Sequence, residues 1–433
     1  MQDAPALRPE GYITTMKDYM AKIKFQLSEV HYPDGRTERM MTTWKVFQQD
    51  LDHAAGFGEQ YLKKGNYKRL ADALLPQVQQ LGNETEKLHH IYKHLVTNLK
   101  WSGGYSMFTR GAKLDDIFDS KECSSAELNM MLYVLLKEAG ISAHLVLVST
   151  RGHGKMYEDY PILDQFNHLL VMAMPDGNRI FLDATDPFRP PGYPAVQALN
   201  SRALLLAPQG TPSWINLPAP ADAASIYNYE LAIEPDGTLT GMFKAAHKGY
   251  SAVAESHAQR EGPGGKKWRE RLIKKYPDAE ILTTSTSEIS YKDASLFDTV
   301  NLRIPNAGQG GSGFLYLSPL LHSDFDENIF KAKERYYPVD VPYPITEYHN
   351  VKLSLPEGFA VEALPEPANF SLPANGGMFR FAAEEKTPGQ IDIMARLNVK
   401  QLRFTPEEYP NLKEMFDLVV QKFGEQIVLK AID

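Results

Sequence analysis

The sequence predicts a multidomain α+β protein, and three observations lead to this prediction. The chain has 433 residues, which at about 150 residues per domain corresponds to roughly three domains. Hydrophobic residues make up 43% and charged residues 23% of the chain, the composition of an ordinary globular protein. Helical spacing is concentrated between residues 84 and 139, whereas most of the remaining sequence has the alternation and turn signals of strands.

Charge and composition disfavour several classes of function. The 54 acidic and 46 basic side chains give a net charge of −8, which disfavours non-specific binding to nucleic acid or to anionic membranes. No apolar run approaches the roughly 18 to 20 residues that a transmembrane helix needs. The single cysteine, Cys123, excludes an internal disulfide and a multi-cysteine metal site.

Residues 1–75 are expected to form the end of a truncated β domain, or an arm that packs on the neighbouring core. The start of the chain has neither the basic leader nor the apolar core of a signal peptide. Strand signals run through this region: residues 19–27 precede a turn at 33–35, and a further strand is expected at 44–47. This is too little sheet to be stable alone.

Two helices with capping signals are predicted in the middle of the chain. Asn83 followed by Glu86 has capping-box spacing, and apolar residues recur at helical intervals through residues 84–99. Ser124 and Glu127 form a second capping box before an apolar helix, which Gly140 ends at the C′ position. Because apolar residues occupy all sides of this second helix, we expect it to be central and buried.

A strand at residues 141–149 and the hairpin after it are predicted to bring a histidine beside an aspartate. If the turn at 175–178 closes a regular hairpin, Leu170 faces Asp183, and His168 lies diagonal to Asp183 on the same face. An imidazole beside a carboxylate is held in one tautomer and one orientation, which is what a general base requires.

Four segments in this order resemble the transglutaminase-like, papain-related superfamily. The family pattern runs roughly G-x-C-x-D-x-A-x-L-L, then A-G-I, F-N-H, and L-D-A-T or L-D-P-T. The corresponding segments here are Ser125-Ala126-Glu127, Ala139-Gly140-Ile141, Phe166-Asn167-His168 and Leu182-Asp183-Ala184-Thr185. The resemblance covers about residues 84–205. It implies a papain-like core, in which a nucleophilic cysteine opens a buried helix and the histidine and aspartate lie on two adjacent strands.

The family pattern leaves the identity of the nucleophile open. Cys123 is the only thiol, but counting back from Ala139-Gly140-Ile141 places the family's cysteine at Ser125. The capping box agrees: with Ser124 as N-cap, Ser125 is the first helical residue and Cys123 belongs to the preceding loop. Three interpretations are open. The cap shifts and Cys123 is the nucleophile, Ser125 is a serine nucleophile, or the site is degenerate.

The degenerate interpretation is preferred, and it predicts a protein with a binding or assembly role. A hydroxyl near its normal pKa gains little from a helix dipole, so exchanging thiol for hydroxyl on an unchanged scaffold usually abolishes the chemistry. The alternative is an active amide hydrolase or acyltransferase, whose nucleophile attacks a carbonyl while helix amides stabilise the oxyanion. His168 would then move the proton and Asp183 would orient His168.

The rest of the chain is predicted to be mainly β. The flanking β segments resemble bacterial envelope proteins that carry this core between β domains, which implies a periplasmic or secreted protein and a protein or peptide as partner. The expected segments are a core at 76–205, a β-rich domain at 206–335 with helices near 249–260 and 266–275, and a sandwich-like domain at 336–433 ending in a helix at 410–429.

Other motifs are expected to be structural. His90 and His94 lie four residues apart on a predicted helix, but no H-E-x-x-H pattern or third ligand accompanies them, so no metal site and no cofactor are expected. The glycine-containing stretches 151–155 and 308–313 lack the strand and helix that frame a phosphate-binding loop, and residues 308–313 are expected to form a flexible loop. Tyr105 stands where related enzymes place groups near the oxyanion, but ordinary packing is the expected role.

Overall fold

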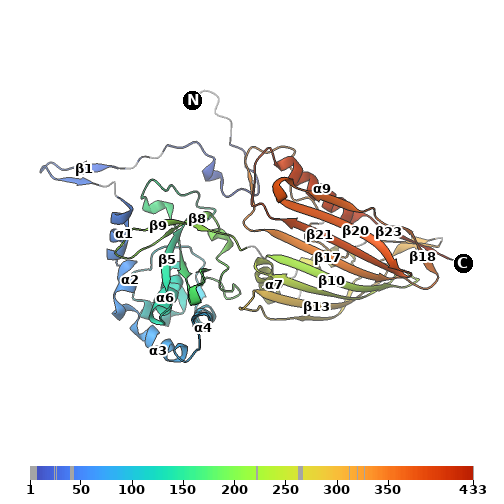
Figure 1. Ribbon diagram of the computed structural model, residues 1–433, viewed down its shortest axis with the longest axis horizontal. Coiled ribbons are helices and arrows are strands. Elements are labelled where there is room, and N and C mark those ends of the chain that lie inside the picture. Colours follow the sequence, from blue (N-terminus) through green and yellow to red (C-terminus); the bar gives the residue numbers. More distant parts are fainter. Residues whose placement is uncertain are drawn as a thin grey trace, which may run out of the picture. The chain divides into compact units, whose positions relative to one another are not determined.

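The computed structural model describes residues 7–23, 25, 27–39, 43–220, 223–261, 267–311, 313–318, 320–325 and 327–432. The chain forms two compact units (Figure 1). Unit 1 comprises Met1–Pro9 and Thr14–Ala219, and unit 2 comprises Glu10–Ile13 and Pro220–Asp433. Within the described residues, no helix combines the length and the apolar character needed to cross a lipid bilayer.

Unit 1 is a helical layer packed against a sheet. Its helices are α1 (Trp44–His53), α2 (Gly58–Leu62), α3 (Lys68–Val78), α4 (Glu84–Asn98), α5 (Leu114–Ser120) and α6 (Ser125–Glu138). Its strands are β1 (Glu29–His31), β2 (Thr37–Arg39), β3 (Lys100–Trp101), β4 (Glu122–Cys123), β5 (Ala143–Val148), β6 (His168–Ala173), β7 (Ile180–Leu182), β8 (Ser201–Leu205) and β9 (Ser213–Leu217). The main sheet has the order β7-β6-β5-β8-β9, and all its neighbouring strands are antiparallel.

Helix α6 is the central, buried helix that the capping box of Ser124 and Glu127 predicts. Ser124 is its N-cap, and the capping box is complete, because the Ser124 hydroxyl accepts from the Glu127 amide while the Glu127 carboxylate accepts from the Ser124 amide. Gly140 follows the helix with a positive φ of 86°, as a C′ residue requires. The helix is buried from Ser125 to Leu136 and packs on β5 and β6. The predicted helix α4 is also confirmed, with Asn83 as its cap.

The predicted hairpin forms β6 and β7 in the expected register. Val171 pairs with Leu182 and Ala173 with Ile180, the register that places residue 170 opposite residue 183. The ladder ends at Leu182, so Asp183 follows the last paired residue of β7. The aspartate therefore leaves the sheet beside the start of β6, where His168 lies.

The expected strand at residues 44–47 is wrong, because this segment begins helix α1. The Thr43 side chain caps the helix by accepting from the Val46 amide, and Phe47 and Leu51 are buried one turn apart. Aromatic and β-branched residues favour a strand locally, but here the buried face of the helix decides the structure. The described part of the expected strand at 19–27 forms no strand either, whereas the turn at 33–35 joins the short strands β1 and β2.

Unit 2 is dominated by one large sheet. Its helices are α7 (Tyr250–Arg260), α8 (Lys267–Lys275) and α9 (Tyr409–Gly424). Its strands are β10 (Ala224–Ile233), β11 (Leu239–Lys248), β12 (Glu280–Thr286), β13 (Ser295–Ile304), β14 (Gln309–Gly311), β15 (Phe314–Leu317), β16 (Val339–Asp340), β17 (Ile345–Ser354), β18 (Phe359–Ala363), β19 (Ala368–Ser371), β20 (Gly377–Thr387), β21 (Gln390–Val399), β22 (Arg403–Phe404) and β23 (Ile427–Ala431). The described strands form a large sheet, β12-β13-β11-β10-β17-β21-β20-β19, and two smaller sheets, β14-β15-β23-β18 and β16-β22.

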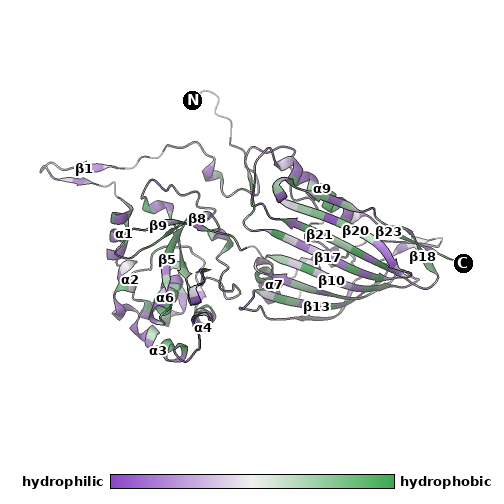
Figure 2. Ribbon diagram, viewed as in Figure 1, coloured by the Kyte–Doolittle hydropathy of each residue, from purple (hydrophilic) through white to green (hydrophobic). Residues whose placement is uncertain are grey.

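The large sheet merges two segments that were expected to be separate domains. Strand β10 pairs in parallel with β17, with Ser225 opposite Glu347, so residues 206–335 and 336–433 contribute to one sheet. Buried and more exposed residues alternate along β10, β13, β17 and β21, and along β21 this follows an alternation of apolar and polar residues (Figure 2). The apolar face packs against α8 and α9 in a single core. The predicted helices near 249–260 and 266–275 are confirmed, whereas the expected last helix ends at Gly424 and gives way to β23.

Candidate active site

The structure brings His168 and Asp183 together. The Nε2 atom of His168 lies 3.3 Å from Oδ2 of Asp183. His168 is the first residue of β6 and Asp183 follows β7, so the hairpin register places both at one edge. Both side chains are fully buried, which makes this a water-shielded histidine–carboxylate pair.

Asp183 is held by donors from four further residues. Its carboxylate contacts Nδ2 of Asn129 at 3.3 Å, Oγ1 of Thr185 at 2.8 Å, Nη1 of Arg189 at 3.1 Å and the backbone amide of Ala195 at 2.9 Å. Burial by itself would raise the pKa of Asp183. The charges of His168 and Arg189, with hydrogen bonds from His168 and the Ala195 amide, instead hold that pKa well below its ordinary value.

Sequence reasoning missed Asn129 and Arg189. Asn129 lies on α6, where its side chain joins the helix to both strands: Nδ2 donates to the Leu169 carbonyl, and Oδ1 accepts from the Ala184 amide. A buried asparagine in an otherwise apolar helix was the available signal, because such an amide needs partners. Arg189 lies in a proline-rich segment whose path the sequence does not reveal.

The two nitrogens of His168 have different environments. Nε2 faces the Asp183 carboxylate, whereas Nδ1 is buried and has no hydrogen-bond partner among the described residues. When the imidazole is neutral, the carboxylate favours the tautomer in which Nε2 carries the proton, which leaves the lone pair on Nδ1. The ring of Tyr105 lies 4.8 Å from the imidazole ring. The arrangement gives the imidazole the orientation of a general base.

Ser125 begins α6 and is bonded to the loop that also contacts His168. Its hydroxyl donates to the Ser106 carbonyl at 3.1 Å and accepts from the Ser106 amide at 2.8 Å. Ser106 directly follows Tyr105, whose ring touches His168. One loop therefore joins the amino end of α6 to the imidazole. The Ser125 hydroxyl proton points to a backbone carbonyl in this structure, not to a base.

Cys123 lies outside the helix. It is in β4, ahead of the Ser124 cap, so the helix start is not shifted to place the thiol at the amino end of α6. The thiol is fully buried. Burial, reinforced by the charge of Glu127, raises the pKa of Cys123 to about 12, which keeps it protonated at neutral pH. An activated nucleophile requires the opposite shift.

Glu127 has a structural role at the same helix end. Its carboxylate accepts from the Ser124 amide and forms an ion pair with Arg110, whose Nε lies 3.0 Å from Oε1. Burial favours the neutral acid, but the hydrogen bonds from Arg110 and from the Ser124 amide lower the pKa of Glu127 overall. Glu127 therefore fixes the start of α6.

The weaker sequence motifs are separate from this pair. His94 stacks on Phe118 with ring centroids 6.3 Å apart. In the described part of the chain, neither His90 nor His94 belongs to a cluster of three potential metal ligands. Part of the glycine-rich stretch 308–313, expected as a loop, forms strand β14.

Unit 2 carries an open groove on the polar face of its large sheet. The groove has a volume of about 490 Å³. Acidic and basic residues line the groove together with Asn350. Its charged lining residues are Glu230, Lys352, Glu384, Lys386, Asp392 and Arg396.

Comparisons with known proteins agree with this architecture at a coarse level. The family described as a domain of unknown function with a solved structure (DUF3858) matches residues 313–429, within unit 2. The chain is similar to a crystal structure described as a "putative protease" from Parabacteroides distasonis, with a TM-score of 0.56 and 15% sequence identity. That match covers 94% of this chain and 63% of the other, so the chain spans less than two thirds of that protein. No curated protein matches the sequence.

Proposed function

We propose that unit 1 is a transglutaminase-like core that has lost its thiol nucleophile and acts in binding or assembly. The fold shared with a protein described as a protease supports the general class. The buried pair of His168 and Asp183, which Asn129 of the central helix α6 contacts, supports the papain-like assignment. The partner on this proposal is a protein or peptide, and the location is the bacterial periplasm or the outside of the cell.

The observation that carries the proposal is the state of Ser125. A cysteine at the first helical position would gain from the helix amides, because they stabilise the thiolate. Ser125 instead holds a hydroxyl whose two hydrogen bonds both go to the Ser106 backbone. The only thiol of the chain, Cys123, is buried and has its pKa raised to about 12. The base and its orienting carboxylate are thus retained without an activated nucleophile.

The proposal predicts that Ser125→Cys restores a reactive thiol, and Cys123→Ala is added so that this thiol is the only one in the chain. In the double variant Cys123→Ala/Ser125→Cys, we expect iodoacetamide labelling at neutral pH, with a midpoint below the ordinary thiol pKa of about 8.5. The Cys123→Ala variant, which has no thiol, and the wild-type protein at neutral pH should remain unlabelled. Labelling is measured by mass spectrometry as a function of pH.

A third substitution tests the role of the histidine. Adding His168→Gln to the double variant should raise the labelling midpoint, because the introduced thiolate loses its imidazole partner. If the introduced thiol titrates like a free cysteine with and without His168, position 125 does not face the imidazole and the assignment of the core fails. Wild-type protein should release no ammonia from glutamine-containing peptides.

A second candidate function is an active serine amide hydrolase or acyltransferase. The Nδ1 atom of His168 favours it, because it is buried without a hydrogen-bond partner among the described residues and could accept a proton from a serine hydroxyl brought within reach. Labelling of wild-type protein by a fluorophosphonate probe, abolished in both Ser125→Ala and His168→Gln, would establish this function and contradict the degenerate one.

A further inference from the structure

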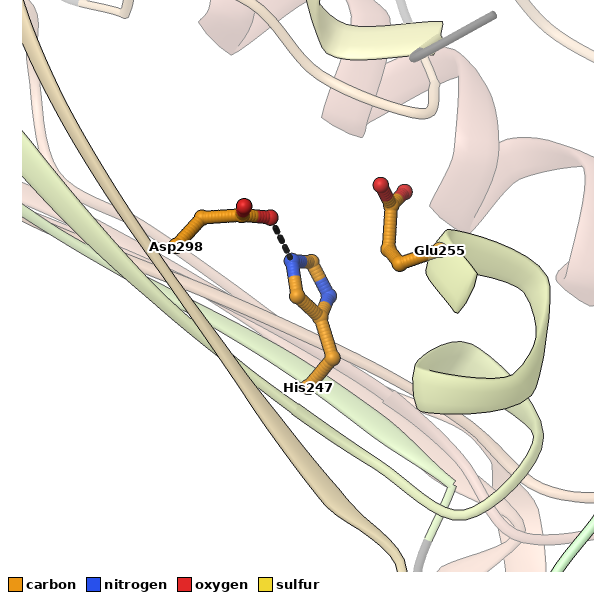
Figure 3. A group of neighbouring side chains, drawn as sticks. All are labelled: His247, Glu255 and Asp298. Carbon is orange, nitrogen blue, oxygen red and sulfur yellow. Dashed lines mark ion pairs between the residues drawn. The ribbon is translucent and has the colours of Figure 1, made fainter. Parts of the chain in front are cut away.

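Unit 2 contains a cluster of one histidine and two carboxylates that is distinct from the pair in unit 1. His247 lies on β11, Asp298 on β13 and Glu255 on α7 (Figure 3). The strand register pairs Ala245 with Asp298 and His247 with Leu296, so His247 and Asp298 are diagonal neighbours on one face. Helix α7 contacts both strands, and its Glu255 side chain points toward the same space as the imidazole.

The three side chains converge to the spacing of metal ligands. One nitrogen of His247 and one oxygen from each carboxylate all lie within 4.8 Å of one another. The Nε2 atom of His247 is 3.6 Å from Oδ2 of Asp298. Neighbouring ligands bound at about 2.0 to 2.1 Å around a tetrahedral cation lie roughly 3.4 Å apart, so only small movements would complete such a site.

The imidazole is oriented for this role. Nδ1 of His247 lies 3.0 Å from Oγ of Ser225 on the adjacent strand β10, which fixes the ring. Nε2 points into the cluster and has no hydrogen-bond partner in the described part of the chain, although His247 is only 1% exposed. Metal-binding histidines typically have one ring nitrogen hydrogen-bonded to an orienting group, while the other nitrogen is available to the metal.

The surroundings hold the buried carboxylate in place. Asp298 is 1% exposed, and its second oxygen accepts a hydrogen bond from the Thr286 hydroxyl on β12. Glu255 is half-buried, so the cluster has a more accessible side at α7. The set therefore has an oriented nitrogen, an anchored carboxylate and a third ligand nearer the surface.

We propose that His247, Glu255 and Asp298 bind a divalent transition cation, with Zn²⁺ as the best match. Two carboxylates balance its charge, and an imidazole favours Zn²⁺ over the hard cations Ca²⁺ and Mg²⁺. The bound cation joins helix α7 to strands β11 and β13. It leaves a coordination position for water, since the cluster supplies three protein ligands.

The test measures Zn²⁺ binding to the full chain after treatment with EDTA. We expect saturable binding by isothermal titration calorimetry and slower amide hydrogen exchange in α7 when Zn²⁺ is present. Asp298→Asn and Glu255→Gln should each abolish or strongly weaken binding. Ser225→Ala, which removes the orienting hydroxyl, should weaken it about 10- to 100-fold. Glu255→Gln changes a half-buried helix residue, so its folding is the least at risk.

Two control variants separate this site from other histidines and carboxylates. Glu261→Gln alters an exposed carboxylate just after α7, and His90→Gln/His94→Gln removes the histidine pair of α4; both should bind Zn²⁺ like wild type. The proposal is overturned if wild-type protein shows no saturable Zn²⁺ binding, or if Ca²⁺ binds in its place. It is also overturned if Glu255→Gln and Asp298→Asn bind Zn²⁺ as tightly as wild type, or if the double histidine variant loses binding.

Discussion

Asp183→Asn is expected to lower the free energy of unfolding of unit 1 by about 3 to 5 kcal/mol, because it breaks a buried ion pair from one side. The carboxylate receives donors from His168, Arg189 and Thr185 and from the Ala195 amide. An asparagine presents one NH₂ group to this set of donors and removes the carboxylate that lies 3.1 Å from Arg189, although Asp186 remains at 3.4 Å.

The neighbouring carboxylate provides a matched control for this variant. Asp186 also pairs with Arg189, at 3.4 Å, and accepts from the Phe188 amide. Asp186→Asn should cost only about 0.5 to 1.5 kcal/mol, because Arg189 keeps Asp183. Urea denaturation is monitored by the hydrogen exchange of peptides from α6 and β6, because these elements belong to unit 1 and report its unfolding separately from that of unit 2. Equal losses in the two variants would contradict the central position of Asp183.

The lowered pKa of Asp183 also predicts that the stability of unit 1 decreases at low pH. The pKa of Asp183 in the folded protein is lowered, and in the unfolded chain an aspartate titrates near 4. Below about pH 4 the unfolded chain therefore binds a proton that the folded protein does not, so this contribution to stability is present above pH 4 and declines as the pH falls. Asp183→Asn should remove that part of the acid dependence.

Unit 2 is expected to lose stability as the pH falls below about 6.5, the ordinary pKa of histidine. Burial of His322, together with the nearby charges of His349 and Arg271, lowers its pKa well below that value. Between the two values the unfolded chain binds a proton that the folded unit does not. Stability therefore rises with pH there, by up to about 1.4 kcal/mol per pH unit.

The variant His322→Phe isolates this contribution. Both ring nitrogens of His322 are buried without a hydrogen-bond partner in the described residues, and the ring packs against those of Tyr227 and Phe243. Phenylalanine should therefore be tolerated, and should stabilise unit 2 by about 1 kcal/mol at pH 7 because it removes unsatisfied polar atoms.

Urea denaturation in EDTA at several pH values between 5 and 8 measures the slope of the free energy of unfolding against pH. The slope should flatten in His322→Phe and persist in His257→Gln, which changes an exposed histidine of the same unit. An unchanged slope in His322→Phe would contradict the prediction.

Short-range patterns in the sequence predict much of the candidate site. The capping box of Ser124 and Glu127 locates the start of α6, and the hairpin turn sets the register that joins His168 to Asp183. Both signals act over a few residues, so they do not depend on the rest of the fold.

The remaining parts depend on contacts between distant residues. Arg189 reaches Asp183 from an irregular segment, and α1 replaces an expected strand because its buried face packs within unit 1. The cluster of His247, Glu255 and Asp298 is assembled from two strands and a helix. No local motif marks these residues, and only the strand register shows that two of them are neighbours.

The parallel pairing of β10 with β17 has a consequence for synthesis of the chain on the ribosome. Asn228 on β10 and Asn350 on β17 are hydrogen-bonded to each other although 122 positions separate them in the sequence. At about 5 to 20 residues per second, roughly 6 to 24 seconds pass between their translation. Throughout that interval one side of β10 is an open edge with alternating apolar side chains, a surface prone to wrong pairing. The pairing of β10 with β17 is therefore a late step in the folding of unit 2 during synthesis.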